Sequence, residues 1–246
     1  MILRKRTILI TGGGSGIGFE TATLLKQNGN RVIIVGRDAK KLKAAADVLP
    51  GAFTIVCDIT NEDQVDALVA RIKNEFSNLS VLINNAGIAH GHHLANGSGA
   101  FDKAGVELAT NFLATIRLTE KLLPILKKQK EAAIVAVSSV LALVPSSVLP
   151  TYSASKAALH SYMQSLRISL ERTTAISVHE ILPPLVDTEF SKVLPGEKMQ
   201  AADVAKEIVA GIENGIKEIF VGKTKQIYDL FLASPQKALH LVNGIN

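Results

Sequence analysis

The chain has 246 residues, of which 47% are hydrophobic, 4% are aromatic and none is tryptophan. A chain of this length can bury a large core as one domain, and a core poor in aromatic residues favours the Val, Ile, Leu and Ala packing of parallel sheets. The formal net charge is +5, but the basic residues are scattered and lack an aromatic stacking platform, which argues against a nucleic-acid partner.

Short apolar runs alternate with longer amphipathic stretches along the chain. The apolar runs predict strands at 6–11, 31–35, 53–56, 80–83, 132–138, 175–181 and 218–222. Helical periodicity predicts helices at 16–27, 38–48, 61–76, 101–128, 150–172 and 201–213. This alternation predicts an α/β fold with a doubly wound, mostly parallel seven-stranded sheet and helices on both faces. We expect one domain over residues 1–224 and a C-terminal extension, 225–246, packed on it.

The first predicted strand ends in a glycine-rich turn, TGGGSGIG, that opens the first predicted helix. Glycines let the backbone turn tightly and approach a pyrophosphate, whose charge is stabilised by free N–H groups at the helix N-terminus. This context predicts a dinucleotide site, with a plain glycine-rich turn as the alternative. The residues predicted to contact the cofactor here are Gly12, Gly14, Ser15, Gly16, Ile17 and Gly18.

The end of the second predicted strand carries the position that discriminates between nicotinamide cofactors. An acidic residue there would hydrogen-bond a ribose 2′-hydroxyl and repel a 2′-phosphate. This chain has Gly36 and then Arg37, whose guanidinium can bind a phosphate in bidentate fashion. We therefore expect NADP(H) to be preferred. NAD(H) is the alternative, since a one-residue shift would bring the Asp38 carboxylate toward the ribose.

Tyr152 and Lys156 are four residues apart, so a helix places them on one face, one turn apart. A lysine ammonium beside a phenol favours the phenolate, which predicts that the pKa of Tyr152 falls from its ordinary value of about 10. Such a tyrosine can give or take a proton at a carbonyl or alcohol oxygen. The hydroxyl of Ser139, thirteen residues earlier, can hydrogen-bond the same oxygen. The pattern predicts carbonyl reduction or alcohol oxidation if a hydride carrier binds nearby.

Together these motifs resemble those of the short-chain dehydrogenase/reductase family. The glycine-rich turn is similar to the family motif Thr-Gly-x-x-x-Gly-Ile-Gly, and residues 84–87 match its Asn-Asn-Ala-Gly element. Asn111 matches an active-site asparagine on a long helix, and Ser139, Tyr152 and Lys156 match the other catalytic positions. The resemblance implies a single-domain Rossmann fold, a nicotinamide cofactor and a small carbonyl or alcohol substrate.

The resemblance also implies roles for individual residues. Tyr152 would be the general acid/base and Ser139 would orient the substrate oxygen. Lys156 would also bind the nicotinamide ribose, and Asn111 would hold its helix and a water of the proton relay. Asp58 matches an aspartate that touches the adenine amino group, and it equally suits a helix cap. The other residues implied to bind the cofactor are Ile59, Asn85, Ala86, Gly87, Pro183, Val186 and Thr188.

One departure from the family pattern follows the sixth predicted strand, where Pro183-Pro184 stands in place of the usual Pro-Gly. The second proline lacks an N–H and restricts the residue before it, so we expect a differently shaped loop facing the nicotinamide. The segment 188–200, which in the family closes over substrate, is short.

The motifs therefore predict an NADP(H)-dependent oxidoreductase that transfers a hydride between nicotinamide and a carbonyl or alcohol substrate. Two other classes remain open. A nucleotide-sensing protein would keep the site and show little turnover, and an epimerase or lyase-type relative would keep cofactor bound with no net redox change. The complete set of four catalytic residues argues against the sensing protein.

The remaining reactive residues indicate no further chemistry. His90, His92 and His93 are close enough in sequence for zinc, but no fourth ligand lies nearby, and we expect no metal site. The single cysteine, Cys57, excludes an intramolecular disulfide and fits a reducing compartment. Because the sequence shows neither a signal segment nor an apolar run of about 18 residues, we expect a cytoplasmic protein.

The segment 225–246 places apolar residues at helical spacing around Pro235 and resembles the tail of a bacterial subgroup named for lipoteichoic-acid D-alanylation. We expect it to pack at a subunit interface or to cover the pocket, with membrane-surface attachment as the weaker alternative. The family resemblance implies pairing of helices 101–128 and 150–172 around two-fold axes, and so a homodimer or homotetramer. One face of the second helix must pack on the parent sheet, so only part of its apolar stripe can face a partner; the stripe consists of Leu159, Tyr162, Met163, Leu166 and Leu170.

Overall fold

A computed structural model describes residues 1–245 of the chain, apart from the side chain of Asn96. Seven strands make up its main sheet, each within two residues of the predicted bounds: β1 (Thr7–Thr11), β2 (Arg31–Gly36), β3 (Phe53–Val56), β4 (Leu79–Asn84), β5 (Ala132–Val137), β6 (Ile176–Leu182) and β9 (Glu218–Phe220). All are parallel and lie in the order β3-β2-β1-β4-β5-β6-β9. The chain therefore winds outward from the middle in both directions, which confirms the predicted doubly wound sheet.

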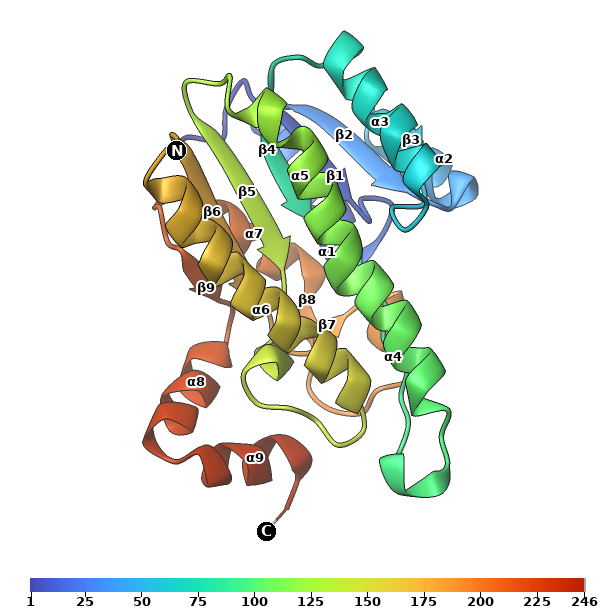
Figure 1. The fold of residues 1–246 in the computed structure, drawn as a ribbon, viewed down its shortest axis with the longest axis vertical. Coiled ribbons are helices and arrows are strands. Elements are labelled where there is room, and N and C mark those ends of the chain that lie inside the picture. Colours follow the sequence, from blue (N-terminus) through green and yellow to red (C-terminus); the bar gives the residue numbers. More distant parts are fainter. Residues whose placement is uncertain (246) are drawn as a thin grey trace.

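Helices cover both faces of this sheet, as predicted. On one face pack α1 (Gly16–Gln27), α2 (Ala39–Val48) and α7 (Ala201–Glu213). On the other pack α3 (Glu62–Glu75), α5 (Ala114–Leu126) and α6 (Pro150–Glu171). Figure 1 shows α5 and α6 in front of the sheet and α1 and α7 behind it. The fold is thus a Rossmann-like α/β arrangement.

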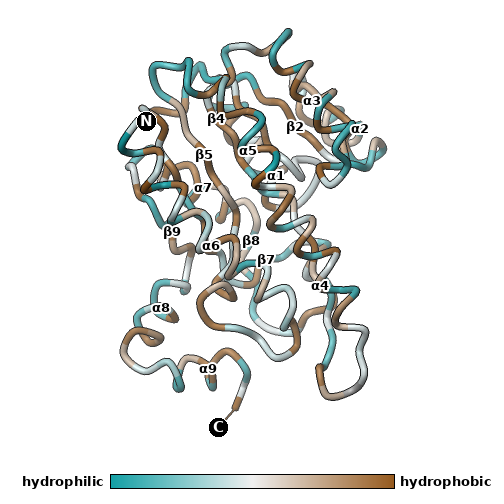
Figure 2. The backbone as a smooth tube through the Cα atoms, in the orientation of Figure 1, coloured by the Kyte–Doolittle hydropathy of each residue, from teal (hydrophilic) through white to brown (hydrophobic). Residues whose placement is uncertain are grey.

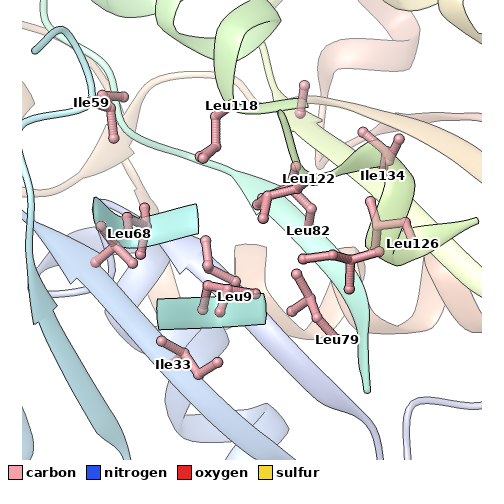
Figure 3. Close-up of a cluster of buried hydrophobic side chains, with 14 of the residues drawn as sticks. Leu9, Ile33, Ile59, Leu68, Leu79, Leu82, Leu118, Leu122, Leu126 and Ile134 are labelled. Carbon is pink, nitrogen blue, oxygen red and sulfur yellow. The ribbon is translucent and has the colours of Figure 1, made fainter. Parts of the chain in front are cut away.

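The core is divided by the sheet into two layers of aliphatic side chains. Successive residues of a strand point to opposite faces, so Leu9 packs toward α3 and α5 while Ile8 and Ile10 pack toward α1 and α7. In Figure 3 the α5 residues Leu118 and Leu122 face the strands. Figure 2 shows strands that are hydrophobic along most of their length and helices in which hydrophobic and hydrophilic residues alternate. Burial of each such side chain contributes about 1.5–3 kcal/mol.

The predicted helix 101–128 differs from the structure in its middle. Instead of one regular helix, α4 (Ala100–Leu108) runs into a π-helical turn, η2 (Ala109–Leu113), and then into α5. The wider turn buries Asn111, which is 1% exposed. Five short elements have no counterpart in the prediction: η1 (Leu94–Asn96), η3 (Val140–Ala142), η4 (Glu189–Ser191), β7 (Val186–Asp187) and β8 (Met199–Gln200).

The tail forms two helices, α8 (Thr224–Ala233) and α9 (Pro235–Asn243), as its apolar spacing predicts. The helices are separated at Pro235, which cannot continue the hydrogen bonding of a helix. Figure 1 shows both beyond the carboxyl ends of the strands. No helix in the described part of the chain is both long and apolar enough to span a membrane.

Candidate active site

A cavity of about 790 Å³ lies at the carboxyl ends of the strands, where parallel α/β sheets bind their ligands. Its walls come from the segments that follow β1 to β6 and from the tail. The cavity brings together every residue predicted for catalysis or cofactor binding except Gly18 and Asn111. Those two lie behind the wall, where they fix neighbouring segments.

The glycine-rich turn is packed so tightly at Gly12 and Gly18 that a side chain would not fit at either position. A Cβ atom on Gly12 would lie 2.9 Å from the Asn85 amide nitrogen, and Gly12 also has a positive φ of +66°. A Cβ atom on Gly18 would lie 2.4 Å from the Gly12 carbonyl oxygen. The N-terminus of α1 follows, and the Ser15 side chain does not cap it. A narrow backbone cradle that ends in free N–H groups fits a dinucleotide pyrophosphate.

Thr11, which the sequence analysis did not single out, joins this turn to the segment after β4. Its hydroxyl accepts hydrogen bonds from the N–H groups of Asn85 at 3.0 Å and Ala86 at 3.1 Å. The Asn85 amide donates in return to the carbonyl oxygens of Thr11 at 2.9 Å and Gly12 at 3.2 Å. The only sequence signal for this role is the threonine directly before the glycines. The two loops that would face a dinucleotide are thereby held as one unit.

The segments after β2 and β3 form the far end of the cavity. The Asp38 carboxylate caps α2, accepting hydrogen bonds from the N–H groups of Lys40 at 2.9 Å and Lys41 at 3.1 Å. Arg37 is exposed, and within residues 1–245 its guanidinium makes no hydrogen bond or ion pair. Asp58 accepts hydrogen bonds from the hydroxyl and N–H of Thr60, which hold its pKa below the ordinary value.

Asn111 fastens the segment after β4 to α6. Its side-chain oxygen accepts from the Ile88 N–H at 2.8 Å, and its amide donates to the Ile88 carbonyl at 2.9 Å and to the Ser155 hydroxyl at 2.9 Å. The Ser155 hydroxyl donates in turn to the Tyr152 carbonyl at 2.7 Å. Asn111 therefore holds the helix that carries Tyr152, and Ser155 is a supporting residue that no sequence pattern indicated.

Tyr152 lies at the start of α6, 8% exposed, with its ring centroid 5.9 Å from that of Phe190. Burial raises the pKa of its phenol above the ordinary value, the interaction with the Ser139 hydroxyl opposes this shift, and the Glu107 carboxylate adds to it. The predicted fall in this pKa is therefore wrong in direction, because burial outweighs the favourable contacts. At neutral pH Tyr152 is a neutral phenol with a proton to donate.

Lys156 lies on α6 one helical turn after Tyr152, and its side chain is buried, with the residue only 3% exposed. Its ammonium group donates to the Val137 carbonyl at 2.8 Å and lies 5.7 Å from the Tyr152 ring centroid. Burial lowers the pKa of Lys156 to about 8, and the buried carboxylate of Glu180 partly opposes this shift. Lys156 is thus anchored to β5 under the tyrosine rather than hydrogen-bonded to it.

Glu180, on β6, is fully buried and meets His160, one turn beyond Lys156 on α6. The His160 Nδ1 atom lies 2.7 Å from a Glu180 carboxylate oxygen, and this hydrogen bond raises the pKa of the histidine. The same two side chains lie within 4.8 Å of Glu218, the one group of residues in the described chain that could jointly hold a metal ion. Arg167 forms a salt bridge with Glu218 at 3.2 Å, whereas the second carboxylate oxygen of Glu180 is buried and has no hydrogen-bond partner among the described residues.

The His160–Glu180 pair predicts a pH-dependent contribution to stability. Because the folded state raises the histidine pKa, the contribution is complete below the unfolded value of about 6.5 and is lost as the pH rises through the folded value. We expect His160→Gln to lower the free energy of unfolding by about 1.5–3 kcal/mol at about pH 5.5 and by less at about pH 9. Urea unfolding at both pH values measures this, with the exposed His93→Gln as control. A loss that is equal at both pH values would contradict it.

Known proteins are similar to this chain in sequence over most of its length. A model of the short chain dehydrogenase family matches residues 6–198. The oxidoreductase DltE of Bacillus subtilis (strain 168) is 36% identical over 249 residues, which cover 99% of this chain and 98% of that protein. Serine 3-dehydrogenase of Agrobacterium fabrum (strain C58) is 37% identical over 198 residues, which cover 80% of this chain and 78% of that protein.

Solved structures show the same fold. A short chain dehydrogenase from Burkholderia cenocepacia J2315, in complex with NADP, superposes with a TM-score of 0.87 at 28% identity, covering 98% of both chains. A Burkholderia phymatum short chain dehydrogenase/reductase, in complex with NAD, has a TM-score of 0.83 at 22% identity, covering 95% of this chain and 96% of that one. With the matched family model and the full-length relative, these similarities show that the chain belongs to the short-chain dehydrogenase/reductase family and is an oxidoreductase.

Proposed function

We propose that this enzyme is an NADP(H)-dependent oxidoreductase that interconverts a carbonyl compound and its alcohol, with Tyr152 as the proton donor and acceptor. The observation that carries the proposal is the position of Tyr152. It is a buried, protonated phenol that lines the same cavity as Ser139 and Lys156, next to a glycine cradle shaped for a dinucleotide. These are the groups that a carbonyl reduction needs around the reacting oxygen.

A bound nicotinamide would supply or accept the hydride. In the direction of reduction, the Tyr152 hydroxyl donates its proton to the carbonyl oxygen as negative charge develops on it. The Ser139 hydroxyl hydrogen-bonds the same oxygen and orients the substrate. The nearby ammonium group of Lys156 stabilises the phenolate that Tyr152 leaves behind. Asn111 keeps α6 and the segment after β4 in register while this happens.

Preference for NADP(H) is supported by charge at the far end of the cavity. Asp38 is engaged in capping α2, so its carboxylate is held by backbone N–H groups. Arg37 is exposed beside it, and Gly36 leaves space, since a Cβ there would meet nothing closer than 3.6 Å. A 2′-phosphate would find the Arg37 guanidinium there, and the neighbouring Asp38 carboxylate already accepts hydrogen bonds from the N–H groups of α2.

Arg37→Ala is expected to weaken NADPH binding about 10- to 150-fold and to change NADH binding little, because a lost hydrogen bond to a charged group costs about 1.5–3 kcal/mol. Gly36→Asp should shift preference toward NADH by repelling the phosphate. Titration of both cofactors measures this. Arg172→Ala, which removes the same charge at the end of α6, is the control. Equal affinity of the unmodified protein for NADH and NADPH would contradict the proposed preference.

Assembly into a homodimer or homotetramer is supported by apolar side chains on α4, η2 and α6. Phe101 is 90% exposed, and Val106, Leu113 and Ile168 are each at least half exposed. Of the apolar stripe named from the sequence, Leu159, Met163 and Leu170 are buried in the core of their own chain, and Tyr162 and Leu166 are partly buried against that core. Light scattering at micromolar concentration should give at least twice the 26.2 kDa of one chain. A mass near that of one chain would contradict this expectation.

A further inference from the structure

We propose that the substrate is an uncharged carbonyl compound with an apolar body. That the reacting group is a carbonyl rests on the proposed function, whereas the uncharged, apolar body is inferred from the side chains that line the cavity. Beyond Tyr152 the cavity is lined by an apolar surface that we call the apolar wall, formed by Leu141, Val148, Phe190, Leu194, Ile227 and Val242.

The order of the strands separates this wall from the cofactor end of the cavity. The glycine turn, Arg37 and Asp58 follow β1, β2 and β3, on one side of the sheet. Ser139 follows β5, and Phe190 follows β6, on the other side. The ring of Phe190 lies 5.9 Å from that of Tyr152, measured between centroids. A substrate whose oxygen meets Tyr152 therefore has its remaining atoms beside the apolar wall.

Each charged residue that lines the cavity either lies at the cofactor end or already interacts with another group of the protein. Arg37, Asp38, Lys41 and Asp58 follow β2 and β3, at the cofactor end. Two more remain among the described lining residues, Glu189 and Lys156.

Neither of these two is placed to hold a charged substrate group. Glu189 forms a salt bridge with Lys41 at 2.6 Å, and the Lys156 ammonium donates to the Val137 carbonyl below Tyr152. A carboxylate or ammonium group on the substrate would lie beside the apolar wall with no oppositely charged side chain to pair with, which is costly. The proposed substrate therefore differs from that of the serine 3-dehydrogenase relative, whose name gives an amino acid with both an ammonium and a carboxylate group.

The tail helices complete the apolar wall. Ile227 comes from α8 and Val242 from α9, which lie beyond the carboxyl ends of the strands in Figure 1. Asn243 fastens α9 to the loop that carries Val148: its side-chain oxygen accepts from the Ser147 N–H at 2.6 Å, and its amide donates to the Pro145 carbonyl at 3.0 Å. The tail thus covers the substrate end of the cavity with hydrocarbon.

The test uses the full-length protein with pairs of ketones of equal length, one neutral and one ending in a carboxylate, such as methyl hexyl ketone and its ω-carboxylated counterpart. Calorimetry in the presence of NADP⁺ measures binding, and NADPH oxidation measures turnover. Each methylene added to the neutral ketones should raise affinity about three- to fourfold until the cavity is filled. The carboxylated partner should bind at least about tenfold more weakly.

Equal or tighter binding of the carboxylated ketone, or affinity independent of chain length, would overturn the substrate class. If neutral ketones bind with the expected chain-length dependence and no NADPH is consumed, the substrate class stands and the proposed function fails.

A variant in the apolar wall gives an independent readout. Val148→Arg should move the ratio of the two affinities at least about tenfold toward the carboxylated ketone, because the guanidinium supplies the missing partner. Val148 is 40% exposed, so the longer side chain has room. Val193→Arg is the matched control, since Val193 is 89% exposed and is not among the residues that line the cavity. An equal shift in both variants would show a general charge effect and overturn the assignment of the wall.

Discussion

Replacing Tyr152 with phenylalanine is expected to lower turnover by about two to four orders of magnitude while leaving NADP(H) binding nearly unchanged. The substitution removes the transferable proton and keeps the ring, so packing against Phe190 persists. Burial keeps the Tyr152 phenol protonated, and this phenol lines the cavity, so its loss removes the proposed proton donor. Steady-state turnover and cofactor titration on the same preparations measure the two effects separately.

Tyr162→Phe is the matched control. Tyr162 lies on the same helix, packs edge to face with Phe112 at 6.3 Å between ring centroids, and does not line the cavity. Its loss of a hydroxyl should leave turnover within about threefold of the unmodified enzyme, or roughly 0.7 kcal/mol. Turnover in Tyr152→Phe close to that of this control would show that the proton comes from elsewhere.

The second large effect is expected in the glycine turn. In Gly18→Ala the added methyl group would lie 2.4 Å from both the Gly12 carbonyl oxygen and the Asn85 amide nitrogen, so α1 must move away from the turn. Overpacking of this kind costs about 1–3 kcal/mol, which in a chain of this size lowers the melting temperature by several degrees, about 2–4 °C for each kcal/mol. Displacement of the cradle should also weaken NADP(H) binding by about tenfold or more.

Gly105→Ala provides the control for this change. Gly105 lies inside α4, and a Cβ there would have no neighbour within 4 Å. Alanine favours a helix by about 1 kcal/mol over glycine, so this variant should be as stable as the unmodified protein or slightly more stable. Thermal unfolding and cofactor titration decide the matter. A Gly18→Ala protein with unchanged melting temperature and affinity would show that the turn is not the rigid cradle described above.

The strands and most helices were predictable because their signals are local. Continuous apolar runs such as that of β5 can only be buried on both faces, and Asp38 and Asn61 cap the helices that they precede. The residues of the site were predictable because their spacing is short and their residue types are restricted. The structure adds that all of them except Gly18 and Asn111 line one cavity.

What escaped prediction depends on contacts between distant segments. The π-helical turn at Asn111 forms because its side chain hydrogen-bonds Ile88 and Ser155, which are 23 and 44 residues away in sequence. The direction of the Tyr152 pKa was misjudged for a similar reason: helical spacing shows that Lys156 is near but not that burial is the larger effect. Spacing alone also cannot tell which residues of the apolar stripe of α6 face its own sheet, and the structure buries Leu159, Met163 and Leu170 in the core.

The most direct test of the central claim is a redox balance on the purified full-length protein. NADPH or NADH is mixed with the neutral ketones described above, and both the oxidised cofactor and the alcohol product are quantified. One alcohol should form for each NADPH consumed, and kcat/KM should be higher with NADPH than with NADH. Cofactor binding without net oxidation of NADPH by any ketone, and without reduction of NADP⁺ by the corresponding alcohols, would contradict it.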